Sequence, residues 1–256
     1  MLRVPPKNLR LWVGPFGDPE RFRRSGNQTV SQLKKLCGLE NDSRVLDIGC
    51  GCGRVALSLT NYLDKGHYDG FDVARPLVSW CSQNITPKVP NFRFKWVNVF
   101  NGGWNPDGKL KASEFRFPYP SATFDLAWAT SVFTHMLPKD TGHFLAEIGR
   151  VLKPGGGCLL SFFLLNESSR SQISSGKGIV KFPFTLDGCR VRDAAEPEQA
   201  IAYDEKAIVA QLRKYRLIPE SPVRYGSWPR ARSYFFSQDV IVARKRLPRC
   251  TSMRTI

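Results

Sequence analysis

The segment Val45–Arg54, VLDIGCGCGR, decides the fold of this chain. A short apolar strand runs into the acidic Asp47 and then into a glycine-rich turn that opens a helix. Turns of this kind bind nucleoside cofactors in α/β proteins, because glycine lets the backbone turn tightly and approach a ligand closely. A strand-to-helix turn without a ligand has the same pattern, so the residues that follow must decide between the two.

The spacing of the glycines narrows the kind of cofactor. A dinucleotide fingerprint requires G-x-G-x-x-G. The glycines of this chain are Gly49, Gly51 and Gly53, and Arg54 stands where the third fingerprint glycine would be. Asp47 stands two positions before the first glycine. This spacing does not fit a dinucleotide.

Together these features resemble the first motif of the class I S-adenosylmethionine-dependent methyltransferases, a family of doubly wound α/β enzymes. The resemblance implies that the glycines pass under the methionine and ribose of S-adenosylmethionine. It also implies that the acidic residue supports the turn and the methionine amino group. The cofactor-binding residues implied in this turn are Asp47, Gly49, Cys50, Gly51 and Gly53.

Two further positions match the family. Asp72 ends the second expected strand, where the resemblance implies a carboxylate that accepts hydrogen bonds from both ribose hydroxyls, with Val73 beside it. Capping of the next helix is the alternative role for such an acid. Asn98 and Val99 follow the third expected strand and match a weaker family pattern against the adenine. An ordinary loop asparagine is the alternative there.

The third match lies further along the chain. Phe117–Leu137, FPYPSATFDLAWATSVFTHML, and Glu147–Gly156, EIGRVLKPGG, resemble the corresponding family segments in order and separation. The resemblance covers residues 28–165 well. Thr130 follows the fourth expected strand and is predicted to contact the cofactor. The Asn/Asp-Pro-Pro-Tyr signature of enzymes that methylate base amines is absent, and so is a Pro-Cys nucleophile pair.

The best candidate for a catalytic residue is His135. Methyl transfer from a sulfonium depends mainly on alignment, and a general base matters when the acceptor is protonated. His135 follows the fourth strand, where the substrate side of the cleft is expected, although a packing role is the alternative. His67 and His143 are predicted to be structural. Aromatic residues that could wall an acceptor pocket, or simply pack in the core, are Trp12, Phe16, Tyr203, Tyr225 and Trp228; Tyr203 and Trp228 are predicted to bind substrate.

The alternation of strands and helices predicts an α/β fold with a doubly wound, mostly parallel, seven-stranded sheet and a last antiparallel strand. The expected strands are Arg44–Ile48, Tyr68–Phe71, Phe92–Val97, Phe124–Ala129, Cys158–Leu165 and Gln238–Ala243, with a turn at Lys153–Gly157. A hairpin with Asp187 and Gly188 at its tip is expected before a helix that starts near Asp204.

We predict one methyltransferase domain with four parts. They are a basic N-terminal cap (1–38), a cofactor-binding core (39–165), an insertion (166–203), and a C-terminal helix and strands with a basic tail (204–256). The insertion is either a lid over the substrate or a surface loop.

Composition is that of an ordinary globular protein, with 42% hydrophobic and 23% charged residues among 256. The apolar runs are too short to span a bilayer, which takes about 20 residues. The N-terminus lacks the apolar core of a secretory signal. Seven scattered cysteines do not form a disulfide or metal pattern, which favours reduced thiols, a cytoplasmic protein and no metal site.

The net charge of +16 is concentrated at the two ends of the chain. Residues 1–35 carry +6 and residues 205–256 carry +9, so the part between is nearly neutral. Such ends attract nucleic acid, anionic lipid or an anionic substrate, or are merely solvated. The main hypothesis is methyl transfer to oxygen or nitrogen of a small molecule, which the basic ends would allow to be anionic. The alternatives are an RNA methyltransferase and a non-catalytic cofactor-binding scaffold.

Overall fold

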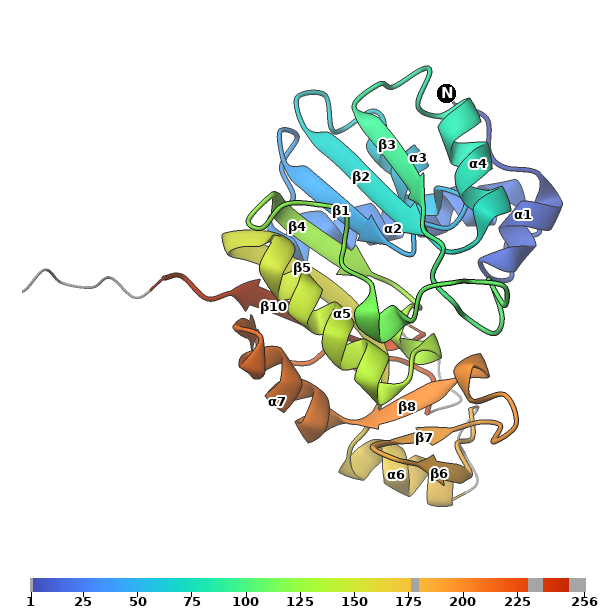
Figure 1. Ribbon diagram of the computed structural model, residues 1–256, viewed down its shortest axis with the longest axis vertical. Coiled ribbons are helices and arrows are strands. Elements are labelled where there is room, and N and C mark those ends of the chain that lie inside the picture. The colour runs from blue at the N-terminus through green and yellow to red at the C-terminus, as the bar shows by residue number, and fades with distance from the viewer. Residues whose placement is uncertain (1, 176–179, 230–236, 249–256) are drawn as a thin grey trace, which may run out of the picture.

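The fold is a twisted sheet with helices on both faces (Figure 1). A computed structural model describes residues 2–175, 180–229 and 237–248. The helices are α1 (Lys7–Trp12), α2 (Pro19–Cys37), α3 (Arg54–Leu59), α4 (Arg75–Asn84), α5 (Pro138–Val151), α6 (Glu167–Ser174) and α7 (Glu205–Lys214), with 3-10 turns η1 (Ala112–Glu114), η2 (Phe133–His135) and η3 (Pro197–Gln199). The strands are β1 (Arg44–Ile48), β2 (His67–Asp72), β3 (Phe92–Trp96), β4 (Phe124–Ala129), β5 (Leu152–Leu165), β6 (Phe184–Leu186), β7 (Cys189–Val191), β8 (Ile201–Asp204), β9 (Leu217–Pro219) and β10 (Asp239–Lys245).

Seven strands form the main sheet, in the order β3-β2-β1-β4-β5-β10-β9. The five from β3 to β5 are parallel neighbours, and β10 runs antiparallel between β5 and β9. The predicted fold class is therefore confirmed, including the last antiparallel strand. Three more strands extend the sheet, because the last three residues of β5 pair with β8, which pairs through β7 to β6.

Alternating side chains of the strands fill two cores. Val45, Tyr68 and Trp128 pack on one face with helices α2, α3 and α4. Leu46 and Ile48 pack on the other face with α5 and α7. Because both faces are covered, the central strands are almost continuously apolar, which is typical of parallel sheets.

Several predicted boundaries are confirmed by the structure. β1 and β4 begin and end where the sequence predicts, α7 begins after its cap Asp204, and β6 and β7 form the predicted hairpin around Asp187 and Gly188. The predicted turn at Lys153–Gly157 is wrong. These residues belong to β5, where a register shift against β4 absorbs the left-handed Gly155 at φ +80°.

The N-terminal part of the fold is longer and more helical than the sequence periodicity alone predicts. Asp18 accepts hydrogen bonds from the first amides of α2, and Gly38 ends the helix with φ +70°. Helix α1 was not predicted. Arg249 and Arg254 of the expected basic tail lie outside the described residues. No helix in the described part of the chain is long and apolar enough to cross a membrane.

Candidate active site

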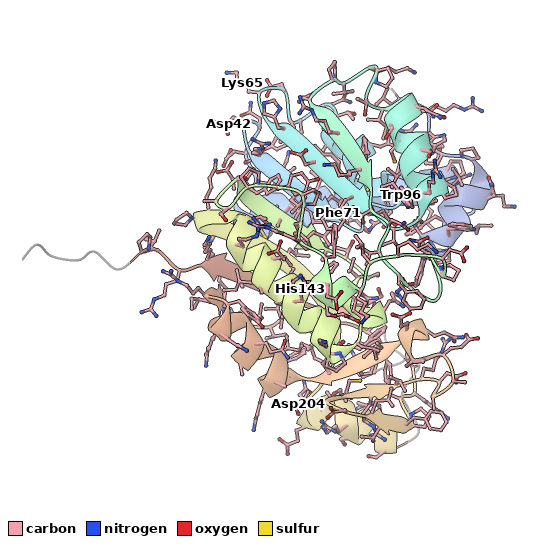
Figure 2. All side chains as sticks on the ribbon, viewed as in Figure 1. Asp42, Lys65, Phe71, Trp96, His143 and Asp204 are labelled. Carbon is pink, nitrogen blue, oxygen red and sulfur yellow. The ribbon has the colours of Figure 1, made fainter. Side chains whose placement is uncertain are left out.

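A cavity of about 430 Å³ lies at the carboxyl ends of β1, β2, β3 and β4. Its size is in the usual range for small-molecule sites, and this edge of a doubly wound sheet is where ligands bind. Figure 2 places Phe71 and Trp96 at this end of the sheet and Asp42 and Lys65 at the other. In Figure 1, α1, the loop after β3 and the segment before β8 converge on the same side.

The glycine turn after β1 is fastened to the end of β2 by its own backbone. The amides of Gly49 and Cys50 donate to the Phe71 carbonyl oxygen at 2.9 and 3.0 Å. The Gly51 amide donates to Asp72 Oδ2 at 2.8 Å, and Asp72 Oδ1 accepts from the Ala74 amide at 2.8 Å. Asp72 thus shapes the turn and the segment before α4. The N-cap of α4 is Ala74, without a side-chain hydrogen bond, so Asp72 does not cap that helix, and its contact with the ribose stays a prediction.

Two of the turn glycines are required by close packing. Gly49 and Gly51 have φ of +74° and +53°. A Cβ on Gly49 would lie 2.5 Å from Val132 Cγ2, and one on Gly51 would lie 2.7 Å from Val13 Cγ1. The turn is therefore enclosed between the segment after β4 and the N-terminal segment. Gly53 lies outside the cavity lining and begins α3 in the left-handed conformation.

Asp47 lines the floor of the cavity and is 2% exposed. It accepts a 2.7 Å hydrogen bond from the Tyr68 hydroxyl. Gly70 makes this contact possible, because a Cβ there would lie 2.8 Å from that hydroxyl oxygen. Burial raises the pKa of Asp47 to about 7, although the Tyr68 hydrogen bond and the charge of Arg54 oppose the rise.

Arg54 connects the turn to helix α2. Its guanidinium donates to the Ser25 carbonyl oxygen and to Thr29 Oγ1, both at 3.2 Å, and to Thr130 Oγ1 at 3.5 Å. Helix α2 can come this close because Gly26 has no side chain. A Cβ at that position would lie 2.3 Å from the Arg54 carbonyl oxygen. Arg54, which stands where a dinucleotide fingerprint has its third glycine, therefore connects α3 to α2 and to Thr130.

Of the residues predicted beside the ribose and the adenine, the structure places some in the cavity wall and others outside it. Val73 and Val99 line the cavity with Leu77. Asn98 does not line it, and its Oδ1 accepts a hydrogen bond from Asn105 Nδ2 at 3.3 Å. The apolar residues at this point, rather than the asparagine side chain, form the wall.

His135 lines the opposite half of the cavity, at the end of η2. Its Nδ1 lies 2.9 Å from the Glu198 carbonyl oxygen, which can only accept, so Nδ1 carries the proton and Nε2 the lone pair. The ring packs edge-to-face on Trp104, with centroids 4.6 Å apart. Burial lowers the pKa of His135, which keeps the ring neutral at pH 7. His143 donates from Nε2 to the Phe115 carbonyl oxygen, which fits its predicted structural role.

Tyr203 and Trp228 do not line the cavity. Both are buried, at 2% and 3% exposed. The Tyr203 hydroxyl donates to the Met136 carbonyl oxygen and is also hydrogen-bonded to Thr141, and Trp228 Nε1 donates to Asp239 Oδ2 at 2.6 Å. Their polar atoms are used inside the core, which leaves the predicted contact with substrate without a structural basis. Burial is the alternative that the sequence had left open.

Several lining residues were missed by the sequence analysis or were named without a role. Leu11, Trp12 and Val13 reach the cavity from the N-terminal segment, and others among them are Phe100, Asn101, Trp104, Asp140 and Glu198. Trp12 had been singled out only as one of several aromatics. Glu198 lies in the expected insertion, so that segment does contribute to the wall.

The described part of the chain contains no group of His, Cys, Asp and Glu side chains that could hold a metal ion. The six cysteines in it are free and buried: Cys37, Cys50, Cys52, Cys81, Cys158 and Cys189. Burial raises the pKa of Cys52 to about 12, so this thiol beside the turn stays protonated. Cys250 lies outside the described residues.

Comparison with known proteins shows what this fold resembles. Residues 46–160 match a family described as a methyltransferase domain. The 27-O-demethylrifamycin SV methyltransferase of Amycolatopsis mediterranei is 29% identical over 193 residues, which are 75% of this chain and 60% of that protein. The chain thus spans less than two thirds of that relative, and the same holds for two others.

Solved structures show the same fold. A Pyrococcus horikoshii protein superimposes with a TM-score of 0.60 at 16% identity, over 90% of this chain and 93% of that one. The Burkholderia thailandensis 1,6-didemethyltoxoflavin-N1-methyltransferase, solved with S-adenosylhomocysteine, gives 0.54 at 20% identity, over 89% and 80%. The match over residues 46–160 and the shared fold therefore agree with the resemblance to the class I S-adenosylmethionine-dependent methyltransferases that the sequence shows.

Proposed function

We propose that this protein transfers a methyl group from S-adenosylmethionine to an oxygen or nitrogen of a small molecule, with His135 as general base. One observation carries the proposal: a single cavity is lined by the glycine turn, by Asp72 and by His135, whose Nδ1 is held by the Glu198 carbonyl oxygen. A cofactor site alone would not need a base at its far end.

The half of the cavity that is lined by the glycine turn and Asp72, the cofactor half, has residues that fit the cofactor. The side-chain-free turn at Gly49 and Gly51 suits the methionine part, and the Asp72 carboxylate keeps lone pairs that could accept from ribose hydroxyls. Val73 and Val99 offer apolar walls to the adenine. When bound, S-adenosylmethionine supplies a methyl group made electrophilic by its sulfonium.

His135 supplies the proton chemistry in the other half of the cavity, the acceptor half. An acceptor O–H or N–H lying near Nε2 gives its proton to that nitrogen as the acceptor atom forms its bond to the methyl carbon. S-adenosylmethionine would supply the methyl carbon and leave as the neutral thioether S-adenosylhomocysteine. The imidazolium then releases the proton to water. Trp104 and Met136 add apolar surface to this half, which favours alignment of a desolvated acceptor.

The charges on the wall favour an acceptor without an anionic group. The acidic residues on the described lining are Asp47, Asp72, Asp140 and Glu198, whereas Arg54 is its one arginine or lysine. That guanidinium is held by Ser25 and Thr29. A carboxylate or phosphate on the acceptor would therefore meet repulsion without a cationic partner. The anionic acceptor that the basic ends allowed is not favoured by the cavity.

Incubation with methyl-labelled S-adenosylmethionine and a panel of matched acceptors tests the proposal. Aromatic scaffolds carrying a hydroxyl, an amine or a carboxylate are compared by mass spectrometry of the products. Labelled product from the neutral hydroxyl or amine members supports it. Cofactor binding without turnover on any member, together with capture of a stable protein partner, would support the scaffold alternative instead.

An RNA acceptor has less support from the structure. Arg216 and Lys245 of the basic C-terminal part lie at the end of the sheet opposite the cavity, since β10 runs antiparallel to β5. Lys245 donates to the Leu152 carbonyl oxygen at 2.6 Å. RNA methylation with a steep loss of affinity in salt would restore that alternative.

A further inference from the structure

Glu198 joins three segments of the chain that are distant in sequence. It lies in η3, within the segment predicted to be an insertion, and it lines the cavity. Its side-chain Oε2 accepts from the Gly102 amide at 2.6 Å. Its main-chain oxygen accepts from His135 Nδ1 at 2.9 Å. One residue therefore contacts both the loop after β3 and the candidate base.

The loop on the other side of this contact is held against the same histidine. Asn101 Nδ2 donates to the His135 carbonyl oxygen at 3.3 Å, and Asn101 Oδ1 accepts from the Trp104 amide at 3.2 Å. The Trp104 ring packs on the imidazole. Gly102 completes the arrangement, because a Cβ there would lie 3.0 Å from Glu198 Oε2 and push the carboxylate away.

The two contacts of Glu198 have different chemical effects. The main-chain oxygen selects the tautomer of His135 with the proton on Nδ1, so that Nε2 is the nitrogen able to accept a proton. The carboxylate makes a charge-assisted hydrogen bond to the loop, which is stronger than one between neutral groups. Burial raises the pKa of Glu198, so the charge is lost at a less acidic pH than for a solvated glutamate.

We propose that Glu198 is a positioning residue for methyl transfer. Its main chain fixes the tautomer and orientation of His135, and its carboxylate fixes residues 101–104 as the acceptor-side wall. This inference rests on the proposed function, because it takes His135 as the base. The cofactor half of the cavity does not depend on the contact.

Three variants separate the side chain from a general structural effect. Glu198→Ala removes the acceptor of the Gly102 amide, and Glu198→Gln restores an uncharged acceptor. Glu196→Ala is the matched control, because Glu196 is an exposed acid in the same turn whose side chain contacts Gln199 and not the loop. Amide hydrogen exchange at Gly102 is measured together with kcat and KM for the acceptor found by the panel.

We expect Gly102 to exchange at least about tenfold faster in Glu198→Ala, the amount that corresponds to a lost hydrogen bond of 1.4 kcal/mol. Glu198→Gln should lie between wild type and Ala, and Glu196→Ala should match wild type. The acceptor KM should rise more than kcat falls in Glu198→Ala, while affinity for S-adenosylhomocysteine stays unchanged. Equal effects in the Glu196 control, or unchanged exchange at Gly102, would overturn the side-chain role.

The tautomer is tested separately by nitrogen NMR of the imidazole in the wild-type protein. The expected result is a protonated Nδ1 and an unprotonated Nε2 at pH 7.5. A proton on Nε2 would overturn the main-chain role. Amide exchange at Gly102 and imidazole NMR need no turnover. If only the proposed function failed, no product would form while the Gly102 and imidazole results stayed as expected.

Discussion

The two halves of the cavity are built in different ways. Apart from the wall residue Val99, the cofactor half is made of backbone amides, a carboxylate and glycines that lie within about thirty positions of one another, between β1 and the start of α4. The acceptor half is assembled by side chains of Trp104, His135 and Glu198. The first half is therefore encoded locally, and the second depends on segments that meet only after folding.

This difference predicts how substitutions in each half affect turnover, cofactor binding and stability. A substitution in the acceptor half should change turnover while leaving the cofactor bound. A substitution in the glycine turn should change both cofactor binding and stability, because Val13 and Val132 pack directly on the turn. The following variants test that separation.

The largest effect is expected for His135→Ala. Loss of a positioned general base lowers rates by about 100- to 10,000-fold. The reduction should appear in kcat of the identified acceptor, and calorimetry with S-adenosylhomocysteine should give the wild-type affinity. In the wild type, kcat/KM should fall as pH drops below the lowered pKa of His135, because the protonated ring cannot accept a proton.

The matched control for that variant is His67→Gln. His67 begins β2 at the end of the sheet away from the cavity, and it is exposed. Its turnover and pH profile should be those of the wild type. If the two variants lost equal activity, or if His135→Ala kept wild-type kcat, the assignment of the base would be wrong.

A smaller effect is expected for Gly51→Ala, compared with Gly38→Ala. Both positions have positive φ, at +53° and +70°, so both substitutions strain the backbone by about 1–3 kcal/mol. A Cβ on Gly38 has nothing within 4 Å, whereas one on Gly51 meets Val13. Thermal unfolding should therefore show a larger loss of stability for Gly51→Ala, and only this variant should bind S-adenosylhomocysteine more weakly.

Equal losses of stability in the two glycine variants would contradict the close packing of the N-terminal segment on the turn. A smaller side chain at Val13, the residue that a Cβ on Gly51 would meet, tests the same contact from its other side. Val13→Ala should recover part of the stability of Gly51→Ala, because it removes the Cγ1 atom that the new Cβ would meet.

For Asp47→Asn the expected effect on stability depends on pH. The folded pKa of Asp47, about 7, lies above its unfolded value of 3.8, so its contribution to stability is present below pH 3.8 and is lost as pH rises to 7. The asparagine does not ionise and still accepts from Tyr68. The difference in Tm between variant and wild type should rise from pH 4 to 7 in favour of the variant and then stay constant. A difference that shrinks with pH would contradict the buried carboxylate.

The same contrast explains what could be predicted from the sequence. The bounds of β1 and β4, the turn and Asp72 follow from local patterns, since strand, glycine turn and acid lie at fixed spacing. The extent of β5 could not be predicted, because Leu152 and Gly157 both pair with β4 and the residues between them form an irregularity inside the strand. Tertiary pairing decided where local turn chemistry had predicted a loop.

The acceptor half could be predicted only in part. His135 was found because it follows a strand at the ligand-binding edge. Nothing in the local sequence around Glu198 marks its contact with Gly102, 96 positions earlier. Tyr203 and Trp228 were chosen for their chemistry, but aromatic residues with a polar atom serve equally well in a core once that atom has a partner. Whether such a residue binds substrate or packs in the core depends on its tertiary contacts, which the local sequence does not give.

The most direct test of the account is a calorimetric titration of S-adenosylhomocysteine into the wild-type protein, Asp72→Ala and Asp72→Asn. Removal of the carboxylate frees the Gly51 and Ala74 amides and takes away the acceptor for the ribose hydroxyls, which should weaken binding by about 10- to 100-fold, as for charge-assisted hydrogen bonds of 1.5–3 kcal/mol. Asp72→Asn, which keeps one acceptor oxygen, should fall between the two. No heat with the wild type, or equal affinity in all three proteins, would contradict a cofactor site built on this turn.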